Sequence, residues 1–302
     1  MMYSHAPHKI LFMGLGASGK SSIRAVVFEG KSPEEVKNYD ATINYYRSAK
    51  TIIDAAFQIF DCGGQENFIS AFIGDQAEFM FNNVKILCWV VDVGDPDQIS
   101  TSKFYFDHAV NRLAEYSPEA TIFCLFHKID LLLPEMVGKV EATMKKYFNA
   151  AGNFDVHYYS TSIFTESIYH VMGELIRKLI IRSGTVKTVS EAIQDFVNTN
   201  TEISGIALYT EEGLPVLEEG FLSQKIVLPA NLWLSNKNRL RKEFNISDTY
   251  KTALETKNYL LISQLVKGKE TLLIAGIAEK TVPIQFLMTK MDQFAAVLTN
   301  LF

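Results

Sequence analysis

Cysteine, long apolar stretches and an excess of one charge are all scarce in this chain of 302 residues. The 3 cysteines, Cys62, Cys88 and Cys124, are far apart and form no CxxC pair. This excludes a disulfide framework and a zinc site, and it suits a reducing compartment. Lys and Arg total 29 against 34 Asp and Glu, so no basic surplus indicates a nucleic-acid partner, and we expect none.

Signals for membrane insertion and secretion are missing as well. No apolar run approaches the roughly 18 residues that a membrane-spanning helix needs. The first residues, MMYSHAPHK, lack the profile of a signal peptide, and neither end carries a myristoylation or prenylation pattern. We therefore expect a cytoplasmic protein that reaches any membrane indirectly, through a partner.

The composition is that of a folded protein, with 48% hydrophobic and 21% charged residues. These values exclude a disordered, collagenous or fibrous chain. At roughly 100–200 residues per domain, the length predicts about two domains.

The first part of the chain alternates apolar runs with helical spacing. Apolar runs of strand length occupy residues 10–13, 55–60, 84–93 and 120–126. A helical stripe runs from Phe106 to Leu113, and residues 168–180 repeat its spacing. Because parallel neighbours need crossover connections, strands separated by helices favour a mostly parallel sheet. We predict an α/β domain over residues 1–183.

The pattern changes in the last third of the chain. Its segments are a helical stripe at 186–197, a hairpin around the turn 211–213, an ambiguous polar stretch at 229–244 that is compatible with a helix, a second hairpin around 267–270 and a helix that Pro283 opens. We predict a smaller α+β domain over residues 184–302, with a small antiparallel sheet and helices on it.

A glycine-rich segment at residues 14–21 reads GLGASGKS and matches GxxxxGK[ST] between the first strand and a helix. The glycines let backbone N–H groups turn toward an anionic phosphate chain, and the helix N-terminus adds its dipole. Lys20 can then reach the β- and γ-phosphates, while the Ser21 hydroxyl ligates Mg²⁺. The phosphate-binding residues that we predict are Gly14, Gly16, Ser18, Gly19, Lys20, Ser21 and Ser22. The strand–loop–helix context disfavours the alternative, a glycine-rich turn with an accidental lysine.

The segment DCGGQ follows the apolar run at residues 55–60. Asp61 can hold the magnesium there, directly or through its water, as an acidic residue at a strand end does in such sites. Gly64 has no side chain to keep a γ-phosphate from its N–H, and Gln65 is placed to orient an attacking water. Alone the motif is more typical of a turn, but behind a phosphate-binding loop it indicates chemistry.

Thr42 lies in the connection between the helix after the glycine loop and the next strand. Its hydroxyl can complete the Mg²⁺ shell only while a γ-phosphate is present. A surface threonine near the start of a strand is the alternative, and the sequence leaves both open.

Two later segments predict a guanine site. His127, Lys128 and Asp130 follow the run at 120–126. The Asp130 carboxylate can accept from the N1–H and 2-amino groups of guanine, and the lysine stem can cover the base. In the segment TSI at residues 161–163, a backbone N–H can meet the guanine carbonyl, which makes Ser162 and Ile163 candidate contacts. A charged strand end and a helix cap are the respective alternatives.

The order of these motifs resembles that of Ras-superfamily GTPases, and the finer match is to the Rag family. That family's guanine motif begins with histidine, its metal motif reads DCGGQ and its third motif ends in TSI, and all three occur here. The resemblance covers most of residues 8–183, with Ala17 as a departure that leaves the phosphate cradle intact. It implies a C-terminal roadblock-like (longin-like) domain for dimerisation, which residues 205–220 match by pattern.

The residues and the resemblance together predict a switch that binds GTP or GDP with Mg²⁺ and hydrolyses GTP. Gln65 and Lys20 are the predicted catalytic residues, and Ser21, Thr42 and Asp61 the metal ligands. No arginine can be assigned as a finger, so we expect slow intrinsic turnover and an activating partner. The resemblance implies dimers with itself or a related GTPase, and scaffolds that link it to membranes. A nucleotide-bound scaffold with little hydrolysis is the alternative, whereas Asp130 disfavours a P-loop ATPase.

Overall fold

The computed structural model describes residues 7–150, 153–181, 183–223, 251–268 and 270–301. The helix expected within residues 229–244 lies outside the described residues. Contacts divide the chain into a first unit (Met1–Val26, Pro33–Thr51 and Ala55–Ile168) and a second unit (Val27–Ser32, Ile52–Asp54 and Tyr169–Phe302). The predicted domain boundary at 183/184 stays a prediction.

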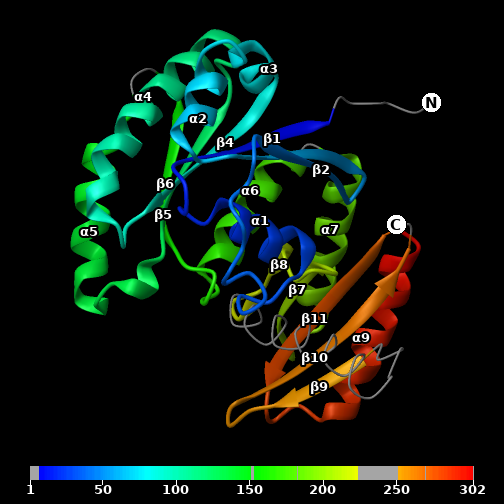
Figure 1. Ribbon diagram of the computed structural model, residues 1–302. Helices are drawn as coiled ribbons and strands as arrows, with labels where there is room; N and C mark the ends of the chain where they lie inside the picture. The colour runs from blue at the N-terminus through cyan, green and yellow to red at the C-terminus, as the bar shows by residue number, and fades with distance from the viewer. Residues whose placement is uncertain (1–6, 151–152, 182, 224–250, 269, 302) are drawn as a thin grey trace. The chain divides into compact units, whose positions relative to one another are not determined.

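The first unit is built on a six-stranded sheet in the order β2-β3-β1-β4-β5-β6 (Figure 1). Its strands are β1 (His8–Met13), β2 (Tyr45–Ile52), β3 (Ala55–Cys62), β4 (Val84–Asp92), β5 (Thr121–His127) and β6 (Asp155–Thr161). β1 runs parallel to β3 and β4, and β5 runs parallel to β4 and β6. The sheet is mostly parallel, which confirms the predicted fold class.

Helices connect these strands. They are α1 (Lys20–Glu29), α2 (Glu66–Ile73), α3 (Ala77–Phe81), α4 (Ile99–Tyr116) and α5 (Pro134–Tyr147), with 3₁₀ turns at Pro96–Gln98 and Ile129–Leu131. In the core, the fully buried Trp89 of β4 packs edge-on against Phe106 of α4, with ring centroids 5.6 Å apart. Its indole N–H donates to Ser102 Oγ at 3.2 Å, so the one polar group of this large side chain is satisfied.

The second unit contains a five-stranded sheet in the order β8-β7-β11-β10-β9. Its elements are α6 (Ser167–Ile180), α7 (Gly184–Thr199), β7 (Ile203–Thr210), β8 (Pro215–Glu219), β9 (Lys251–Glu255), β10 (Tyr259–Lys267), β11 (Thr271–Glu279) and α9 (Ile284–Thr299), and α6 begins within the first unit. The pairings β7–β8, β7–β11, β10–β11 and β9–β10 are antiparallel. This arrangement confirms the small antiparallel sheet with helices.

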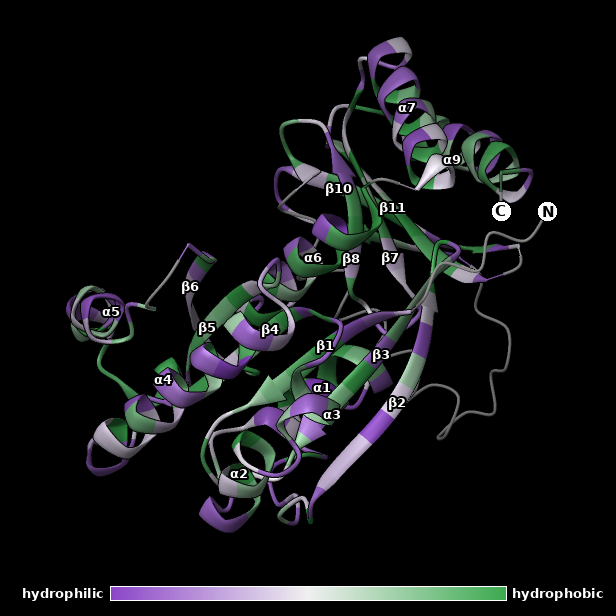
Figure 2. Ribbon diagram, turned by 90° about the horizontal axis from the view of Figure 1, so that it is seen from above, coloured by the Kyte–Doolittle hydropathy of each residue, from purple (hydrophilic) through white to green (hydrophobic). Residues whose placement is uncertain are grey.

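Two helices of the second unit lie side by side in Figure 2. Phe196 of α7 stacks on Phe294 of α9, with ring centroids 4.2 Å apart. Met291 of α9 packs on β11 where Gly276 has no side chain, because a Cβ at residue 276 would lie 2.5 Å from the Met291 sulfur. The two predicted stripes therefore meet each other as well as the sheet.

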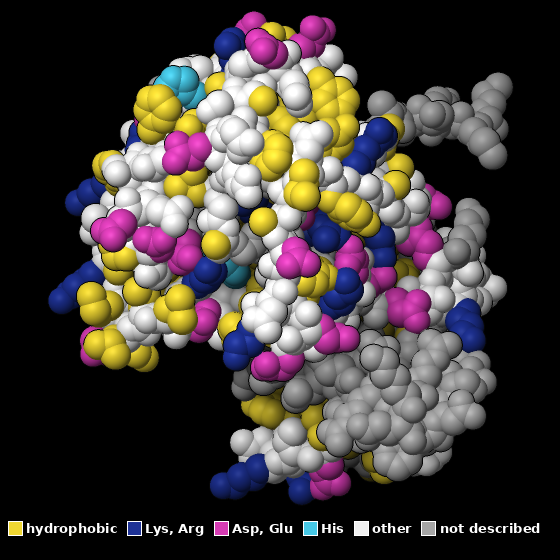
Figure 3. Space-filling model, in the orientation of Figure 1, with side chains coloured by type: hydrophobic (Ala, Val, Ile, Leu, Met, Phe, Trp, Pro, Cys, Tyr) yellow, Lys and Arg dark blue, Asp and Glu magenta, His cyan; other side chains and the backbone are white. Residues whose placement is uncertain are grey.

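The face in view in Figure 3 mixes acidic, basic and apolar side chains, in keeping with the net charge of −5. Within the part of the chain that the structure describes, no helix is both long and apolar enough to cross a membrane.

Candidate functional site

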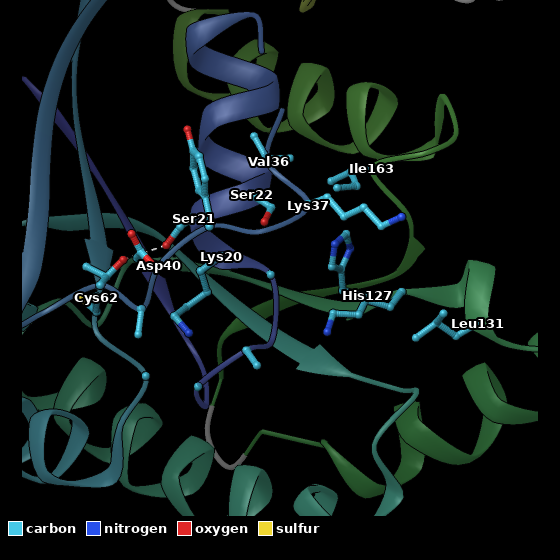
Figure 4. Close-up of a pocket in the computed structure, with 18 of the residues that line it drawn as sticks. Lys20, Ser21, Ser22, Val36, Lys37, Asp40, Cys62, His127, Leu131 and Ile163 are labelled. Atoms are coloured by element: carbon cyan, nitrogen blue, oxygen red, sulfur yellow. Dashed lines mark hydrogen bonds between the residues drawn. The ribbon is translucent and has the colours of Figure 1, made fainter. Parts of the chain in front are cut away.

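A cavity of about 370 Å³ lies in the first unit, at the carboxyl ends of its parallel strands (Figure 4). Segments that are far apart in the sequence line it together. The predicted site residues among its lining are Gly16, Gly19, Lys20, Ser21, Ser22, Thr42, Gly64, Gln65, His127, Lys128, Asp130 and Ile163. Four predicted residues, Gly14, Ser18, Asp61 and Ser162, are not part of this lining and are buried. The carboxyl edge of a parallel sheet is where such folds bind ligands.

The glycine loop turns between β1 and α1 through backbone conformations that favour glycine. Gly14 and Gly19 have φ angles of 138° and 99°. Ala17 also has a positive φ, 59°, and its side chain is exposed. A Cβ at Gly19 would lie 2.6 Å from a carbon of the His127 ring, so this glycine brings the loop against the predicted base-binding motif.

Lys20 is a buried cation at the first position of α1. Only 5% of its surface is exposed, and its amine donates to the Leu15 carbonyl at 2.7 Å and to Ser18 Oγ at 3.2 Å. Burial lowers the pKa of Lys20 to about 8, against the opposing charge of Asp61. Figure 4 shows its side chain reaching into the cavity. A desolvated ammonium on neutral oxygens is well suited to meet a phosphate chain.

The predicted metal ligands come from three segments. Ser21 Oγ and Thr42 Oγ1 are 2.8 Å apart. Asp61 is fully buried, its Oδ2 accepts from Nε of Arg24 at 3.1 Å, and its Oδ1 has no hydrogen-bond partner among the described residues. Mg²⁺ prefers oxygen ligands and takes one or two carboxylates beside phosphates. These two hydroxyls and the orphaned carboxylate oxygen fit that preference, so they can hold Mg²⁺.

Gly64 brings the DCGGQ segment onto the glycine loop. A Cβ at residue 64 would lie 2.5 Å from the backbone N of Gly16 and from the Leu15 carbonyl oxygen, so only glycine fits. Gln65 is exposed and lines the cavity, and its carbonyl accepts from the N–H groups of Phe68 and Ile69 at 3.0 and 3.1 Å. The start of α2 thus fixes the Gln65 backbone beside the cavity.

His127 is 2% exposed at the end of β5, and its Nδ1 lies 2.9 Å from Thr161 Oγ1. Burial lowers the pKa of His127 to about 4, so the imidazole is neutral at physiological pH. Lys128 has a left-handed φ of 65° and its amine bonds Asp92 Oδ2 at 2.7 Å. This pair braces the loop, and Asp130 stays exposed at the cavity.

The segment TSI reaches the same wall of the cavity. Ile163 lines it, whereas the Ser162 N–H donates to Ser167 Oγ at 3.0 Å and Ser162 Oγ accepts from the Phe164 N–H at 3.1 Å. A guanine carbonyl at the Ser162 N–H would compete with Ser167. In this structure the Ser162 N–H is therefore engaged within the loop, as the helix-cap alternative describes, and its contact with a base stays a prediction.

Sequence reasoning missed the partners behind the site. Arg24 pairs with Asp61, Asp92 pairs with Lys128, and Thr161 supports His127. Arg24 had a signal: it follows Lys20 by four positions, and residues four apart share one face of a helix. Asp92 also had one, since it is the polar end of the buried run of β4.

Comparison with known proteins decides the family. Residues 9–219 match the Gtr1/RagA G protein conserved region. The chain belongs to the Gtr1/RagA family. Over 219 residues it is 26% identical to GTP-binding protein gtr1 of Schizosaccharomyces pombe, covering 70% of this chain and 71% of that protein. It is 31% identical over 184 residues to GTP-binding protein GTR1 of Saccharomyces cerevisiae, covering 59% of each.

The chain is similar to a human relative as well. It is 28% identical over 190 residues to human Ras-related GTP-binding protein C, covering 60% of this chain and 46% of that protein. Apart from gtr1 of S. pombe, the matched regions of these relatives span less than two thirds of their length. Membership of the Gtr1/RagA family confirms the family resemblance, and with it a GTP-binding GTPase whose ligands are GTP or GDP with Mg²⁺, while the roadblock-like domain stays a prediction.

Proposed function

We propose that this Gtr1/RagA member is a switch in which the cavity at the carboxyl edge of the parallel sheet binds GTP with Mg²⁺ and hydrolyses the γ-phosphate. The observation that carries the proposal is the convergence of separate segments, around Lys20, Thr42, Gly64, His127 and Ile163, on one cavity. Two of these residues, Lys20 and His127, are buried polar groups, and a fold gains no stability from placing them there because burying them costs free energy.

The phosphate chain lies in the glycine loop. Backbone N–H groups from Gly14 to Ser22 cradle it, and the Lys20 amine exchanges its two neutral acceptors for the β- and γ-phosphate oxygens. Because the amine is already desolvated, its charge acts at full strength on the developing negative charge of the transition state.

Ser21 and Asp61, through Oδ1, would hold the metal. Thr42, whose hydroxyl now lies 2.8 Å from that of Ser21, would join them when a γ-phosphate is present. When bound, Mg²⁺ neutralises charge on the β- and γ-phosphates. The loop carrying Thr42 is then ordered in the GTP state and released after hydrolysis, which changes the surface that partners meet.

Gln65 orients the water that attacks the γ-phosphorus in line, while Gly64 leaves room for the phosphate at its N–H. The position of Gln65 at the start of α2 supports this role, because its backbone is fixed and its side chain reaches the cavity. An activating partner completes the site, since no arginine of the chain is assigned to the γ-phosphate.

Asp130 accepts hydrogen bonds from the N1–H and 2-amino groups of guanine. The stem of Lys128 covers one face of the base, and the loop of Ser162 and Ile163 meets its carbonyl. His127 does not touch the base in this proposal. It is neutral and joins the glycine loop to Thr161, so it sets the distance between phosphate and base subsites.

The domain proposal is a GTPase domain over residues 1–183 and a roadblock-like dimerisation domain over 184–302. Similarity to relatives named GTP-binding protein gtr1 and Ras-related GTP-binding protein C supports a heterodimer of two related chains, and a homodimer is the alternative. In this scheme the protein acts in the cytoplasm and reaches membranes through scaffold partners.

The first experiment identifies the ligand. Protein purified in Mg²⁺ is denatured, and the released nucleotide is separated by chromatography. We expect GDP or GTP at close to one per chain; adenine nucleotides, or none even after incubation with GTP, would contradict the proposal.

A second experiment tests hydrolysis. Gln65→Leu should slow single-turnover GTP hydrolysis by about 10²-fold, as the loss of a group that positions the attacking water can, without changing GTP affinity. Gln76→Leu, at the N-cap of α3 and not part of the cavity, is the matched control. Equal hydrolysis by both variants and wild type would favour a scaffold that holds nucleotide and hardly hydrolyses it.

A further inference from the structure

The Asp61 carboxylate is divided between two environments. Its side chain is completely buried. Oδ2 accepts a charge-assisted hydrogen bond from Arg24 at 3.1 Å, and Oδ1 has no hydrogen-bond partner in the described part of the chain. Because Arg24 holds Oδ2, it determines that Oδ1 is the oxygen that stays open.

Arg24 is itself held from two sides. Its side chain is 9% exposed and projects from α1, one turn after Lys20. While its Nε reaches Asp61, its guanidinium carbon lies 4.2 Å from the ring centroid of Tyr46 in β2. A planar guanidinium with one edge on a carboxylate and one face on an aromatic ring has little freedom to turn.

We propose that Arg24 is a positioning residue for the magnesium ion, which fixes Asp61 through Oδ2 and leaves Oδ1 as the oxygen for the metal. This inference rests on the proposed function, since it requires that the cavity bind nucleotide with Mg²⁺. It adds Arg24 to that function as a residue that contacts the metal ligand Asp61. The conformation of Arg24 also depends on Tyr46 in β2, the strand that follows Thr42 in the chain. Mutation of a residue that hydrogen-bonds a metal ligand in this way commonly lowers metal affinity by about 10–100-fold.

Charge and position predict opposite results at this residue. As a nearby cation, Arg24 repels Mg²⁺, so its removal should tighten metal binding if charge alone mattered. If Arg24 acts by holding Asp61 in position, its removal should instead weaken Mg²⁺ binding. Arg24→Lys keeps the charge but loses the Nε edge and the planar face, so it isolates position, whereas Arg24→Met removes both.

The experiment measures release of a fluorescent GDP from the full-length chain as free Mg²⁺ is varied, and the affinity for the same nucleotide in EDTA. We expect Arg24→Lys to raise the half-saturating Mg²⁺ concentration about tenfold, with unchanged affinity in EDTA. In an Asp61→Asn background, Arg24→Lys should cause no further shift. Arg112→Lys on α4, whose side chain bonds Ile73 and Glu115, is the matched control and should behave as wild type.

Two outcomes overturn the inference. Wild-type Mg²⁺ dependence in Arg24→Lys, with tighter Mg²⁺ binding by Arg24→Met, would show that only the charge acts. A loss of affinity in EDTA equal to the loss in Mg²⁺ would show general damage to the fold. Should Arg24→Met not fold, Arg24→Lys alone decides, because it keeps the buried charge balanced. Wild-type protein that binds no guanine nucleotide would instead contradict the proposed function.

Discussion

The two units bury polar groups in different ways. In the first unit the buried side chains include ionisable groups that gather at one place, Lys20, Asp61 and His127. Among the described residues of the second unit, the polar residues that are buried as a whole are uncharged, for example Ser204, Thr210 and Gln264. Burying charge is costly unless partners or a ligand compensate it. The contrast therefore separates a unit that binds a ligand from one that is built for packing.

Strand direction explains why the charges gather. In a parallel sheet the carboxyl ends of neighbouring strands share one edge, so β3, β5 and β6 deliver Asp61, His127 and Thr161 to the same edge. In the antiparallel sheet of the second unit, neighbouring strands end at opposite edges. Loops that follow its strands are therefore dispersed.

The largest expected effect tests the packing unit. Phe294→Ala removes the ring that stacks on Phe196 and should lower the free energy of unfolding by about 3–5 kcal/mol, because a buried aromatic leaves a cavity. GDP affinity should stay at the wild-type value. Chemical denaturation and nucleotide titration of the full chain measure both, with the half-exposed Val297→Ala on the same helix as control. A fall in GDP affinity under conditions in which the variant is folded would contradict the separation of nucleotide binding and packing between the two units.

Next in size is the reverse experiment in the binding unit. Lys20→Ala should weaken GTP binding by about 10²-fold, since a desolvated ammonium–phosphate contact cannot be replaced by the backbone. Lys251→Ala in the second unit loses its ion pair with Asp292 but should keep GTP affinity. Competition with a fluorescent guanine nucleotide measures both variants, and wild-type affinity in Lys20→Ala would reject the phosphate-binding loop.

A change of base preference sharpens the assignment further. Asp130→Asn should weaken GTP by about 1–3 kcal/mol, because the amide places an NH₂ against a guanine donor. Xanthosine triphosphate has a carbonyl at that position and should gain affinity. Displacement by GTP, xanthosine triphosphate and ATP measures the order, with the exposed Asp97→Asn outside the cavity as control. Retained GTP preference in Asp130→Asn would leave residues 127–130 a charged strand end.

The last expected effect concerns pH. Burial lowers the pKa of His127 from 6.5 to about 4 in the folded chain, with Asp130, Lys128 and Asp92 as the nearby charges. Between pH 6.5 and 4 the unfolded chain binds more protons, so stability falls as the pH falls through this window. His127→Asn should reduce that loss by on the order of 1–3 kcal/mol in urea unfolding. His108→Asn, at an exposed position of α4, serves as control, and equal slopes in all three proteins would place the pH dependence elsewhere.

Much of this architecture could be predicted from the sequence where burial leaves a pattern. The continuous apolar runs became β4 and β5, and the two turns of the second unit lie between β7 and β8 and between β10 and β11. Elements without a buried face could not be predicted. In β2 only Ile52 is buried, and in α5 only Met144 is, so neither has an apolar stripe.

The residues of the candidate site also fall into a group that the sequence predicts and a group that it does not. Its motif residues could be predicted because phosphate chemistry restricts residue type and spacing, as at Gly19 and Lys20. The pairings of the residues behind them could not, since these depend on tertiary packing. Nothing in the local sequence pairs Arg24 with Asp61, or reveals that Ser167 occupies the N–H of Ser162.

Gly64 and Gly276 have different prospects in a genetic suppressor screen. At Gly64 an added methyl group would meet only backbone atoms of Leu15 and Gly16, and no second substitution can remove a backbone. At Gly276 it would meet side chains, the Met291 thioether and an Ile206 methyl group, which a smaller residue at either position can withdraw. Alanine at 276 should therefore be rescued by second-site revertants in α9 or β7, whereas alanine at 64 should yield only true revertants.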